Sequence, residues 1–346
     1  MNVSYYVIYW PYRITWSILK LFRKKKSIIF YCGSHTDYAV IKPLYKYFPE
    51  AKIVAKNRKV QKALKEYGIT SSLYPSFPDV LVMPRHVARK FPEPRMKKVG
   101  LRHGAYHFKD FVEAERYNAF DIYFVTSIRE VELALKRGIT SAQAIGFPKL
   151  DPAFNGCITE EVLEQYREKI GLDNKQPVVI FATTWNKAGT SAINRWIDHL
   201  SELTLDYQVL VTVHQWTTKD YIKKLENTPD IIYIKDKDII PYLMLADVMV
   251  CDKSSIIAEF CALDKPIVTF SVPDGRRPSI EVNTMLTEIS IQVDTYEEMK
   301  EALKEAVLNP DKLAAQRKKY NKIMFDKLDG KAGFRAASII REKFLG

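Results

Sequence analysis

Short runs of β-branched and aliphatic residues alternate along the chain with longer stretches whose apolar positions recur every three or four residues. The first half predicts six strands, at residues 27–32, 52–55, 79–83, 97–101, 122–125 and 142–146. Helical patterns, such as those at 37–47 and 59–67, lie between them. This alternation is typical of βαβ units, so we expect an α/β fold with a mostly parallel sheet covered on both faces.

The same pattern starts again after "GFPKLDPAFNG" (146–156), a stretch rich in Pro and Gly that reads as a linker. A helix near 159–170 is followed by the apolar runs "PVVIFATTW", "YQVLVTVH", "DIIYI", "DVMVCD" and "KPIVTF". The tail from Tyr296 is helical in pattern, with a break at "LDGKAG" (328–333). We therefore expect an N-terminal segment over 1–26, α/β domains over 27–150 and 151–326, and a last helix over 327–346 that crosses back to the first domain.

Length and composition fit two globular domains. The chain has 346 residues, of which 47% are hydrophobic and 27% are charged. This length exceeds that of an ordinary domain with a single core. Its four cysteines form no CxxC pair and have no metal-site spacing with histidine, so they indicate a reducing compartment. We see no secretory signal and no uncharged apolar run of about 18 residues, so a spanning helix is not expected.

Positive charge is concentrated at the N-terminus. The net charge is +12, and the first 26 residues hold six Lys and Arg and no acidic residue. Helical spacing brings Tyr12, Trp16 and Leu19 together, which fits an amphipathic helix in the plane of an anionic membrane surface. The alternative is a first helix packed on the protein's own core. Nucleic acid is not an expected partner, because no recognition motif accompanies the charge.

Polar residues follow several predicted strands, where ligands bind in open parallel sheets. The segments are "GSHTD" (33–37), "RHGAYH" (102–107), "TTWN" (183–186) and "DKSS" (252–255), and His214 ends "YQVLVTVH". Four of the six histidines lie at or near these ends: His35, His103, His107 and His214. Since core packing alone does not explain this clustering, we expect a ligand site there.

The segment "CDKSSIIAEF" carries the clearest signal. A strand ends at Cys251 and a helix is predicted to start near Ser254, so unpaired N–H groups would face an anion. Ser254 and Ser255 would add hydroxyl donors, and Glu259 would accept hydrogen bonds from ribose hydroxyls. The alternative is that Asp252 or Ser254 simply caps the helix.

The two central histidines suit different tasks. We expect His214 to donate to a phosphate oxygen, the alternative being a buried histidine bonded to backbone. His103 precedes Gly104, which permits a tight turn and close approach of a substrate. A histidine near its ordinary pKa takes a proton from an attacking hydroxyl at neutral pH.

Other strand-end residues are assigned to the acceptor. We expect His35 and Asp37 to line its cleft, with Arg102 and His107 as auxiliary residues. The chain has no GxxxxGK[ST], GxGxxG, HExxH or GxSxG motif, which removes most support for kinase and hydrolase functions. No cluster of carboxylates suggests a divalent metal site, and no cofactor is expected.

Several of these segments occur in an order that resembles a known family. They are "RHG", "DIYFVTS", "GFPKLD", "PVVIFATTWN", the strand ending in histidine, and "ADVMVCDKSSIIAEFCALDKPIVTF". From Lys97 to Phe270 the chain resembles the CDP-glycerol glycerophosphotransferases of teichoic acid synthesis. The resemblance implies two Rossmann-like domains facing a cleft, of the glycosyltransferase-B type. It also implies transfer of glycerol phosphate from CDP-glycerol to a hydroxyl of a membrane lipid-linked acceptor, with release of CMP.

The resemblance also assigns residues. It implies that His103 is the base, that His214, Ser254 and Ser255 contact the donor pyrophosphate, and that Glu259 is the acidic residue of that helix. Thr183 and Thr184, with Asn186 nearby, match a donor loop.

Two segments depart from the family pattern. "HGAY" stands where the family commonly has "HGT". After the "KPI" strand comes "SVPDGRRPSIEV", in which Arg276 and Arg277 are the phosphate-binding candidates. The chain shows no long extra N-terminal region like that of polymerising members, which favours a primase-like enzyme that adds one unit.

The resemblance further implies a peripheral protein at the cytoplasmic face of the cell membrane. Two other functions stay open on the sequence. A UDP-sugar glycosyltransferase or epimerase would use the same fold, and a non-catalytic membrane scaffold would keep it without the chemistry. Competition by CDP or by UDP would distinguish the glycerophosphotransferase from a UDP-sugar enzyme. The presence of His103 and His214 argues against the scaffold.

Overall fold

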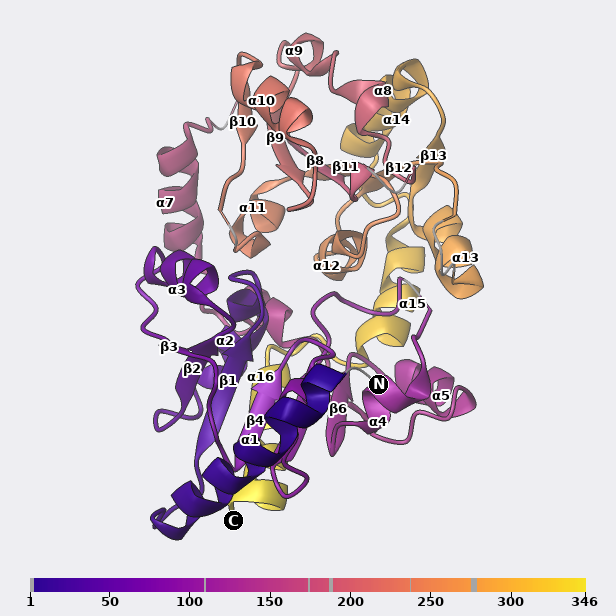
Figure 1. The fold of residues 1–346 in the computed structure, drawn as a ribbon. Helices are drawn as coiled ribbons and strands as arrows, with labels where there is room; N and C mark the ends of the chain where they lie inside the picture. The colour runs from indigo at the N-terminus through magenta and orange to yellow at the C-terminus, as the bar shows by residue number, and fades with distance from the viewer. Residues whose placement is uncertain (1–2, 109, 174, 187–188, 237, 275–278) are drawn as a thin grey trace. The chain divides into compact units, whose positions relative to one another are not determined.

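The computed structural model describes residues 3–108, 110–173, 175–186, 189–236, 238–274 and 279–346. The chain divides into two compact units (Figure 1). The first unit comprises Met1–His103, Phe111–Asp151 and Asp329–Gly346, and the second comprises Gly104–Asp110 and Pro152–Leu328. Each unit holds one parallel sheet, as the alternating pattern predicts.

The first sheet has seven parallel strands in the order β3-β2-β1-β4-β5-β6-β7. Their bounds are β1 Ile28–Cys32, β2 Lys52–Ala55, β3 Ser72–Leu73, β4 Val80–Met83, β5 Lys97–Leu101, β6 Ile122–Val125 and β7 Ala142–Ala144. Every residue of β1, β4 and β6 is buried, which explains their unbroken apolar character.

Helices cover both faces of this sheet. The bounds are α1 Val3–Leu21, α2 Asp37–Tyr45, α3 Arg58–Lys65, α4 Ala114–Asn118, α5 Ile128–Lys136 and α16 Ala332–Ile340, with short turns η1 Ala88–Lys90 and η2 Pro148–Leu150. One core cluster joins the sheet to α2, α3 and α16. A second cluster joins the opposite face to α1, α4 and α5. Polar caps start two of the helices, where the side chains of Asn57 and Ser127 accept from the amides three residues on.

The N-terminal helix packs on the protein itself. Tyr12 and Trp16 are buried in the second cluster of the first unit. The Tyr12 hydroxyl donates to the carbonyl of Ser76, and Trp16 Nε1 donates to the carbonyl of Pro78 at 2.7 Å. The expectation that Tyr12 and Trp16 face a membrane is therefore wrong, because the polar ends of both rings find backbone partners in the segment before β4. No helix in the described ranges is long and apolar enough to span a bilayer.

The second sheet has six parallel strands in the order β10-β9-β8-β11-β12-β13. Their bounds are β8 Val178–Thr183, β9 Gln208–Val213, β10 Ile231–Tyr233, β11 Val248–Cys251, β12 Ile267–Phe270 and β13 Ile291–Val293. The helices are α7 Glu160–Ile170, α8 Ile193–Trp196, α9 Leu200–Leu203, α10 Lys219–Asn227, α11 Ile240–Leu245, α12 Ile256–Ala262, α13 Ile280–Ile289, α14 Tyr296–Leu308 and α15 Ala314–Phe325. A short helix, α6 Asp151–Phe154, stands where the chain enters this unit.

The last helix, α16, belongs to the first unit, and in Figure 1 its yellow ribbon lies among the indigo and purple elements there. The Asp151 carboxylate accepts hydrogen bonds from the amides of Ala332 and Gly333, at 3.0 and 2.7 Å. A Cβ placed on Gly333 would lie 2.6 Å from the carbonyl oxygen of Pro43 in α2. Only a glycine permits this close packing of α16 on α2.

Candidate active site

The order of strands in the second unit reverses between β8 and β11. In open parallel sheets, ligands bind beyond the carboxyl ends of the strands at such a point. The segments that follow these two strands are "TWN", which begins at Thr184, and "DKSS", which begins at Asp252. The topology thus places most of the expected donor residues at one edge of one sheet.

Asp252 ties the two segments together. Its buried carboxylate accepts from the Thr184 amide at 2.8 Å, the Thr183 hydroxyl at 2.8 Å and the Ala192 amide at 3.1 Å. Burial raises the pKa of the Asp252 carboxyl, and these hydrogen bonds oppose that rise. Asp252 and Thr183 therefore shape the loop after β8, whereas Thr184 is partly exposed at its surface.

The serine pair begins α12. Ser254 and Ser255 are partly exposed, and Ser255 at the N-cap position makes no side-chain capping hydrogen bond. Asp252 directs its carboxylate to the loop after β8, so it does not cap α12. Glu259 is buried on the same helix. The phosphate and ribose contacts expected of these residues stay predictions.

His214 has a defined tautomer. Its Nδ1 accepts a hydrogen bond from the backbone amide of Trp216 at 3.2 Å. Because that nitrogen must be unprotonated, Nε2 carries the proton in the neutral ring and is a donor. Asn186 and Thr218 exchange two hydrogen bonds, of 3.3 and 3.1 Å, which join the loop after β8 to the loop after β9. His214 and Asn186 thus adjoin the same strand ends as Thr184.

In the first unit the strand order reverses between β1 and β4. Asp37 is buried there, and its carboxylate accepts from the amides of Gly33 and Ser34 at 2.8 and 3.0 Å. Arg85, which follows β4, donates to Asp37 through Nε at 2.7 Å. Asp37 therefore organises the loop that carries the partly exposed His35. Our sequence reasoning missed Arg85, although its position two residues after a central strand was a usable signal.

Arg102 is held inside the first unit. It forms an ion pair with Glu130, which is fully buried, and its Nε donates to Oε1 of that residue at 3.0 Å. Glu130 Oε2 accepts from the amide and hydroxyl of Thr126 at 2.8 and 2.9 Å. The Arg102 guanidinium also lies over the ring of Phe111, 5.3 Å from the ring centroid, which is within the roughly 6 Å reach of a cation–π contact. These contacts join the ends of β5 and β6 directly before the exposed His103.

The loop after His103 packs within the second unit, to which residues 104–110 belong. Tyr106 has a φ of 54°, and its hydroxyl donates to Glu281 in α13 at 2.7 Å. The ring of Tyr106 lies 4.1 Å from that of the buried His107. A Cβ on Gly104 would lie 2.8 Å from the Ser255 hydroxyl oxygen, so the glycine permits a close approach to the serine pair.

Two expected residues, Arg276 and Arg277, lie outside the described residues. Among the residues that are described, no group of three or more His, Cys, Asp and Glu side chains is arranged to hold a metal ion.

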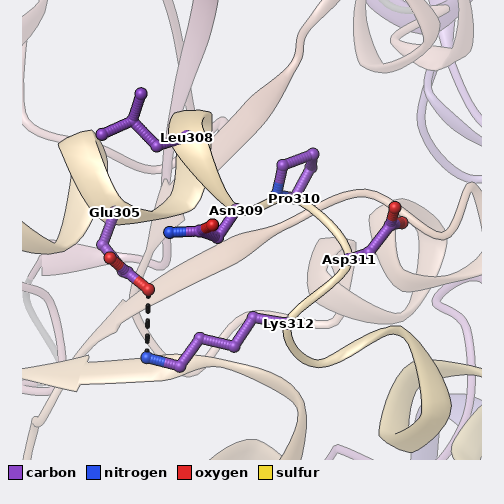
Figure 2. A pocket seen from close by; sticks show the side chains of 6 residues that line it. All are labelled: Glu305, Leu308, Asn309, Pro310, Asp311 and Lys312. Atoms are coloured by element: carbon purple, nitrogen blue, oxygen red, sulfur yellow. Dashed lines mark hydrogen bonds and ion pairs between the residues drawn. The ribbon is translucent and has the colours of Figure 1, made fainter.

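Two open hollows in the described part of the second unit lie away from the strand-end residues. One hollow has a volume of about 560 Å³ and lies at the end of α14, where Lys312 Nζ donates to Glu305 Oε1 at 3.1 Å. Figure 2 shows the side chains that line it. A neighbouring hollow of about 490 Å³ shares Pro310 with it and is lined by Pro177, Asp247 and Pro266, which precede β8, β11 and β12. Both hollows therefore belong to the amino edge of the sheet, opposite the expected donor site.

Solved structures with the same fold include a wall teichoic acid polymerase, a UDP-GlcNAc 2-epimerase and a protein solved with UDP. The wall teichoic acid polymerase TagF has a TM-score of 0.68 at 14% identity, over 92% of this chain and 89% of that one. A UDP-GlcNAc 2-epimerase from Methanocaldococcus jannaschii has a TM-score of 0.63 at 12% identity, over 91% and 99% of the two chains. S. aureus MnaA, solved with UDP, has a TM-score of 0.63 at 13% identity, over 92% and 96%. The fold is thus the glycosyltransferase-B fold.

No curated protein matches the chain by sequence. A family model does match it, over residues 95–342, which span both units. That model describes CDP-glycerol:poly(glycerophosphate) glycerophosphotransferases. The match includes the strand-end segments from His103 to Ser255, and it favours a CDP-glycerol donor over a UDP-sugar. The chain is a CDP-glycerol glycerophosphotransferase-like enzyme and belongs to this family.

Proposed function

We propose that the enzyme transfers glycerol phosphate from CDP-glycerol to a hydroxyl of a membrane lipid-linked acceptor and releases CMP. The observation that carries this proposal is the family match over residues 95–342. The polar residues at the β8/β11 switch point support it, because they adjoin the place where this fold class binds nucleotides.

The donor residues have separate roles in the proposal. His214 donates from Nε2 to a pyrophosphate oxygen, and Ser254, Ser255 and Thr184 add hydroxyl and amide donors. Glu259 accepts from the ribose hydroxyls. Fixed donors of this kind stabilise the negative charge that grows on the departing CMP phosphate. Asp252 and Thr183 act indirectly by holding the loop after β8, and Asn186 links that loop to the one that carries His214.

His103 is the proposed base. An acceptor oxygen attacks the phosphorus that bears the glycerol, and the P–O bond to the CMP phosphate breaks. CMP leaves with the bonding electron pair, while the acceptor proton passes to the His103 imidazole. Such proton transfer contributes about 10²- to 10⁴-fold in rate.

The remaining residues serve the acceptor or the phosphates. We assign His35 and His107 to acceptor binding, and Arg276 and Arg277 to phosphate binding. Asp37 and Arg102 act by positioning, because both side chains are engaged in ion pairs within the first unit.

A lipid-linked acceptor lies in a membrane. We therefore place the enzyme at the cytoplasmic face of the cell membrane as a peripheral protein. We propose that it adds a single glycerol phosphate unit, as a primase does.

The first experiment measures CMP release from CDP-glycerol with and without a lipid-linked disaccharide acceptor, with UDP-sugars as control donors. Acceptor-dependent CMP release is the expected result. The His103→Ala variant should lose transfer and keep nearly normal nucleotide affinity. Release of UDP from a sugar donor, with silence toward CDP-glycerol, would move the function to glycosyl transfer or epimerisation on the same fold. Wild-type rates in His103→Ala would remove this residue from the mechanism.

A further inference from the structure

The loop that follows His103 is attached to α13 of the second unit. Residues 104–110 belong to that unit, and Ala105 and Tyr106 within this loop are buried. The Tyr106 hydroxyl donates to Glu281 Oε1 at 2.7 Å, which is typical of a strong hydrogen bond to a carboxylate. We call this hydrogen-bonded pair the Tyr106–Glu281 latch.

The backbone of Tyr106 indicates that the path of this loop is held by its contacts. Its φ of 54° lies in the left-handed region, which is unfavourable for a residue with a Cβ. Such a conformation persists only where surrounding contacts hold it, and it often marks a functional segment. Here the Tyr106 ring lies 4.1 Å from the ring of His107, and the hydroxyl is bound by Glu281.

The helix α13 is a firm base for the latch. The Ser279 side chain caps its first turn by accepting from the Val282 amide at 3.4 Å. The buried residues of the helix are Val282, Met285, Leu286 and Ile289, and the helix packs against α15. A shift of the Glu281 backbone would therefore require a packed helix to move.

The same part of α13 also holds the donor loop. Asn283 Nδ2 donates to both carboxylate oxygens of Asp274, at 3.2 and 3.3 Å. Lys253, which directly precedes the serine pair, donates from Nζ to Asp274 Oδ1 at 2.6 Å. The loop after His103 and the loop of the serine pair are thus anchored on one helix.

His103 itself is exposed, but the residues around it in the chain are restrained. Before it, the Arg102 guanidinium is paired with the buried Glu130. After it, only Gly104 separates His103 from the buried Ala105 of the latched loop. Since misplacing a reacting group by about 1 Å can lower a rate about a hundredfold, these restraints bear directly on the proposed base.

We propose that Glu281 is a positioning residue, which sets His103 for proton transfer by holding Tyr106 through the latch. The proposal deepens the proposed function and rests on it, because it takes His103 as the base. Glu281 acts through Tyr106 and the backbone of the loop. Loss of the latch should therefore slow transfer and leave binding of CDP-glycerol unchanged.

The test is steady-state kinetics of CMP release by the full chain, with CDP-glycerol and the lipid-linked acceptor. Tyr106→Phe keeps the ring and removes the hydroxyl. It should lower kcat at least about tenfold, which is the usual worth of a hydrogen bond to a charged group. Glu281→Ala should lower kcat equally, whereas Glu281→Gln keeps an acceptor oxygen and should stay within about threefold of the wild type. The KM for CDP-glycerol should stay near the wild-type value in all three variants.

The double variant Tyr106→Phe with Glu281→Ala tests whether the two residues act as one unit. Both changes remove the same hydrogen bond, so the double variant should be no slower than either single variant. Two independent defects would instead multiply to about a hundredfold loss of kcat.

Matched controls come from the same unit. Tyr296→Phe removes a hydroxyl that donates to the His199 carbonyl at 3.1 Å. Glu288→Ala removes a carboxylate of α13 that accepts from Lys319 at 2.7 Å. Both controls should keep the wild-type kcat, because neither bond holds the loop after His103.

Four results would overturn the latch while the wild type releases CMP. They are a wild-type kcat in Tyr106→Phe, a raised KM at unchanged kcat, independent losses in the double variant, and controls as slow as the latch variants. A wild-type enzyme that releases no CMP from CDP-glycerol would instead refute the proposed function, and the latch proposal would fall with it.

Discussion

Changing Glu130 to glutamine tests whether the buried Arg102–Glu130 ion pair positions His103. The carboxylate of Glu130 is fully buried and accepts from Arg102 on one oxygen and from Thr126 on the other. A glutamine has the same shape but only one acceptor oxygen. Its NH₂ group must therefore face a donor, either the Arg102 guanidinium or the Thr126 amide. Losing one partner of a buried ion pair costs about 3–5 kcal/mol, because the other charge stays buried without compensation.

Hydrogen exchange followed by mass spectrometry measures this cost unit by unit in the full chain. A loss of about 3–5 kcal/mol should speed the slowest exchange of β5 and β6 between about a hundredfold and several thousandfold. Slow exchange in β8 and β11 of the second unit should not change. The control is Glu132→Gln on the same helix, which breaks an exposed pair with Arg129 and should cost less than about 1 kcal/mol.

Kinetics of the same variant test the positioning role. If the ion pair sets the backbone from which His103 projects, kcat should fall while the KM for CDP-glycerol stays near the wild-type value. Exchange rates within threefold of the wild type would refute the energetic reasoning. The expected loss of protection with an unchanged kcat would refute the link to His103.

Three further changes have simple expected outcomes. His214→Asn keeps an acceptor for the neighbouring amide but removes the Nε2 donor, so steady-state kinetics should show the KM for CDP-glycerol raised about tenfold to a hundredfold. Gly333→Ala should destabilise the packing of α16 by about 1–3 kcal/mol, because its Cβ meets the Pro43 carbonyl, and limited proteolysis should then cut α16 faster. Burial raises the pKa of Asp79, but hydrogen bonds from Ser27 and Lys20 and the charge of Arg23 outweigh it and hold that pKa below its usual range. Ionised Asp79 therefore stabilises the folded first unit at pH values above the usual carboxyl pKa of about 4, and this stabilisation is lost as the pH falls through the lower pKa of Asp79 in the folded state. The fluorescence emission of Trp16 should accordingly shift to the red only below about pH 4.

The strands of this fold are readable from the sequence because most of them are buried on both faces. Patterns predicted 52–55, 97–101 and 122–125, and the structure places β2, β5 and β6 there. The same reasoning missed β3, since its two residues are too few to show a pattern and neither is buried.

The site is harder to predict, because its side chains depend on partners that are distant in sequence. Asp252 reads as a ligand-binding or capping residue, yet its carboxylate is used by the loop after β8, at Thr183 and Thr184. Arg102 likewise reads as an auxiliary residue at a strand end, and its partner Glu130 lies 28 residues away. The spacing of residues along the sequence predicts neither contact, because each contact depends on which strands become neighbours in the sheet.

The orientation of α1 shows a different limit. A period near 3.6 residues indicates that a helix has an apolar face, but α1 has two such faces. The choice between them depends on which side chains find partners, and Tyr12 and Trp16 reach the carbonyls of Ser76 and Pro78. The local sequence of α1 does not predict this packing, because both carbonyl partners lie more than 60 residues away along the chain.

The attachment of α16 to the first unit makes the order of synthesis important. The chain leaves that unit after Asp151 and returns at Asp329, so its final helix is made only after the whole of 152–328. On the ribosome, the second sheet is complete while the first still lacks the helix that covers one face of its core. Until then the apolar surface under α16, and the Asp151 carboxylate that will hold its amides, stay open to solvent or to a chaperone. A gene cut between the two units at residue 151 would therefore produce a first half with an uncovered core. Co-expression of 329–346 as a separate peptide offers a direct way to restore it.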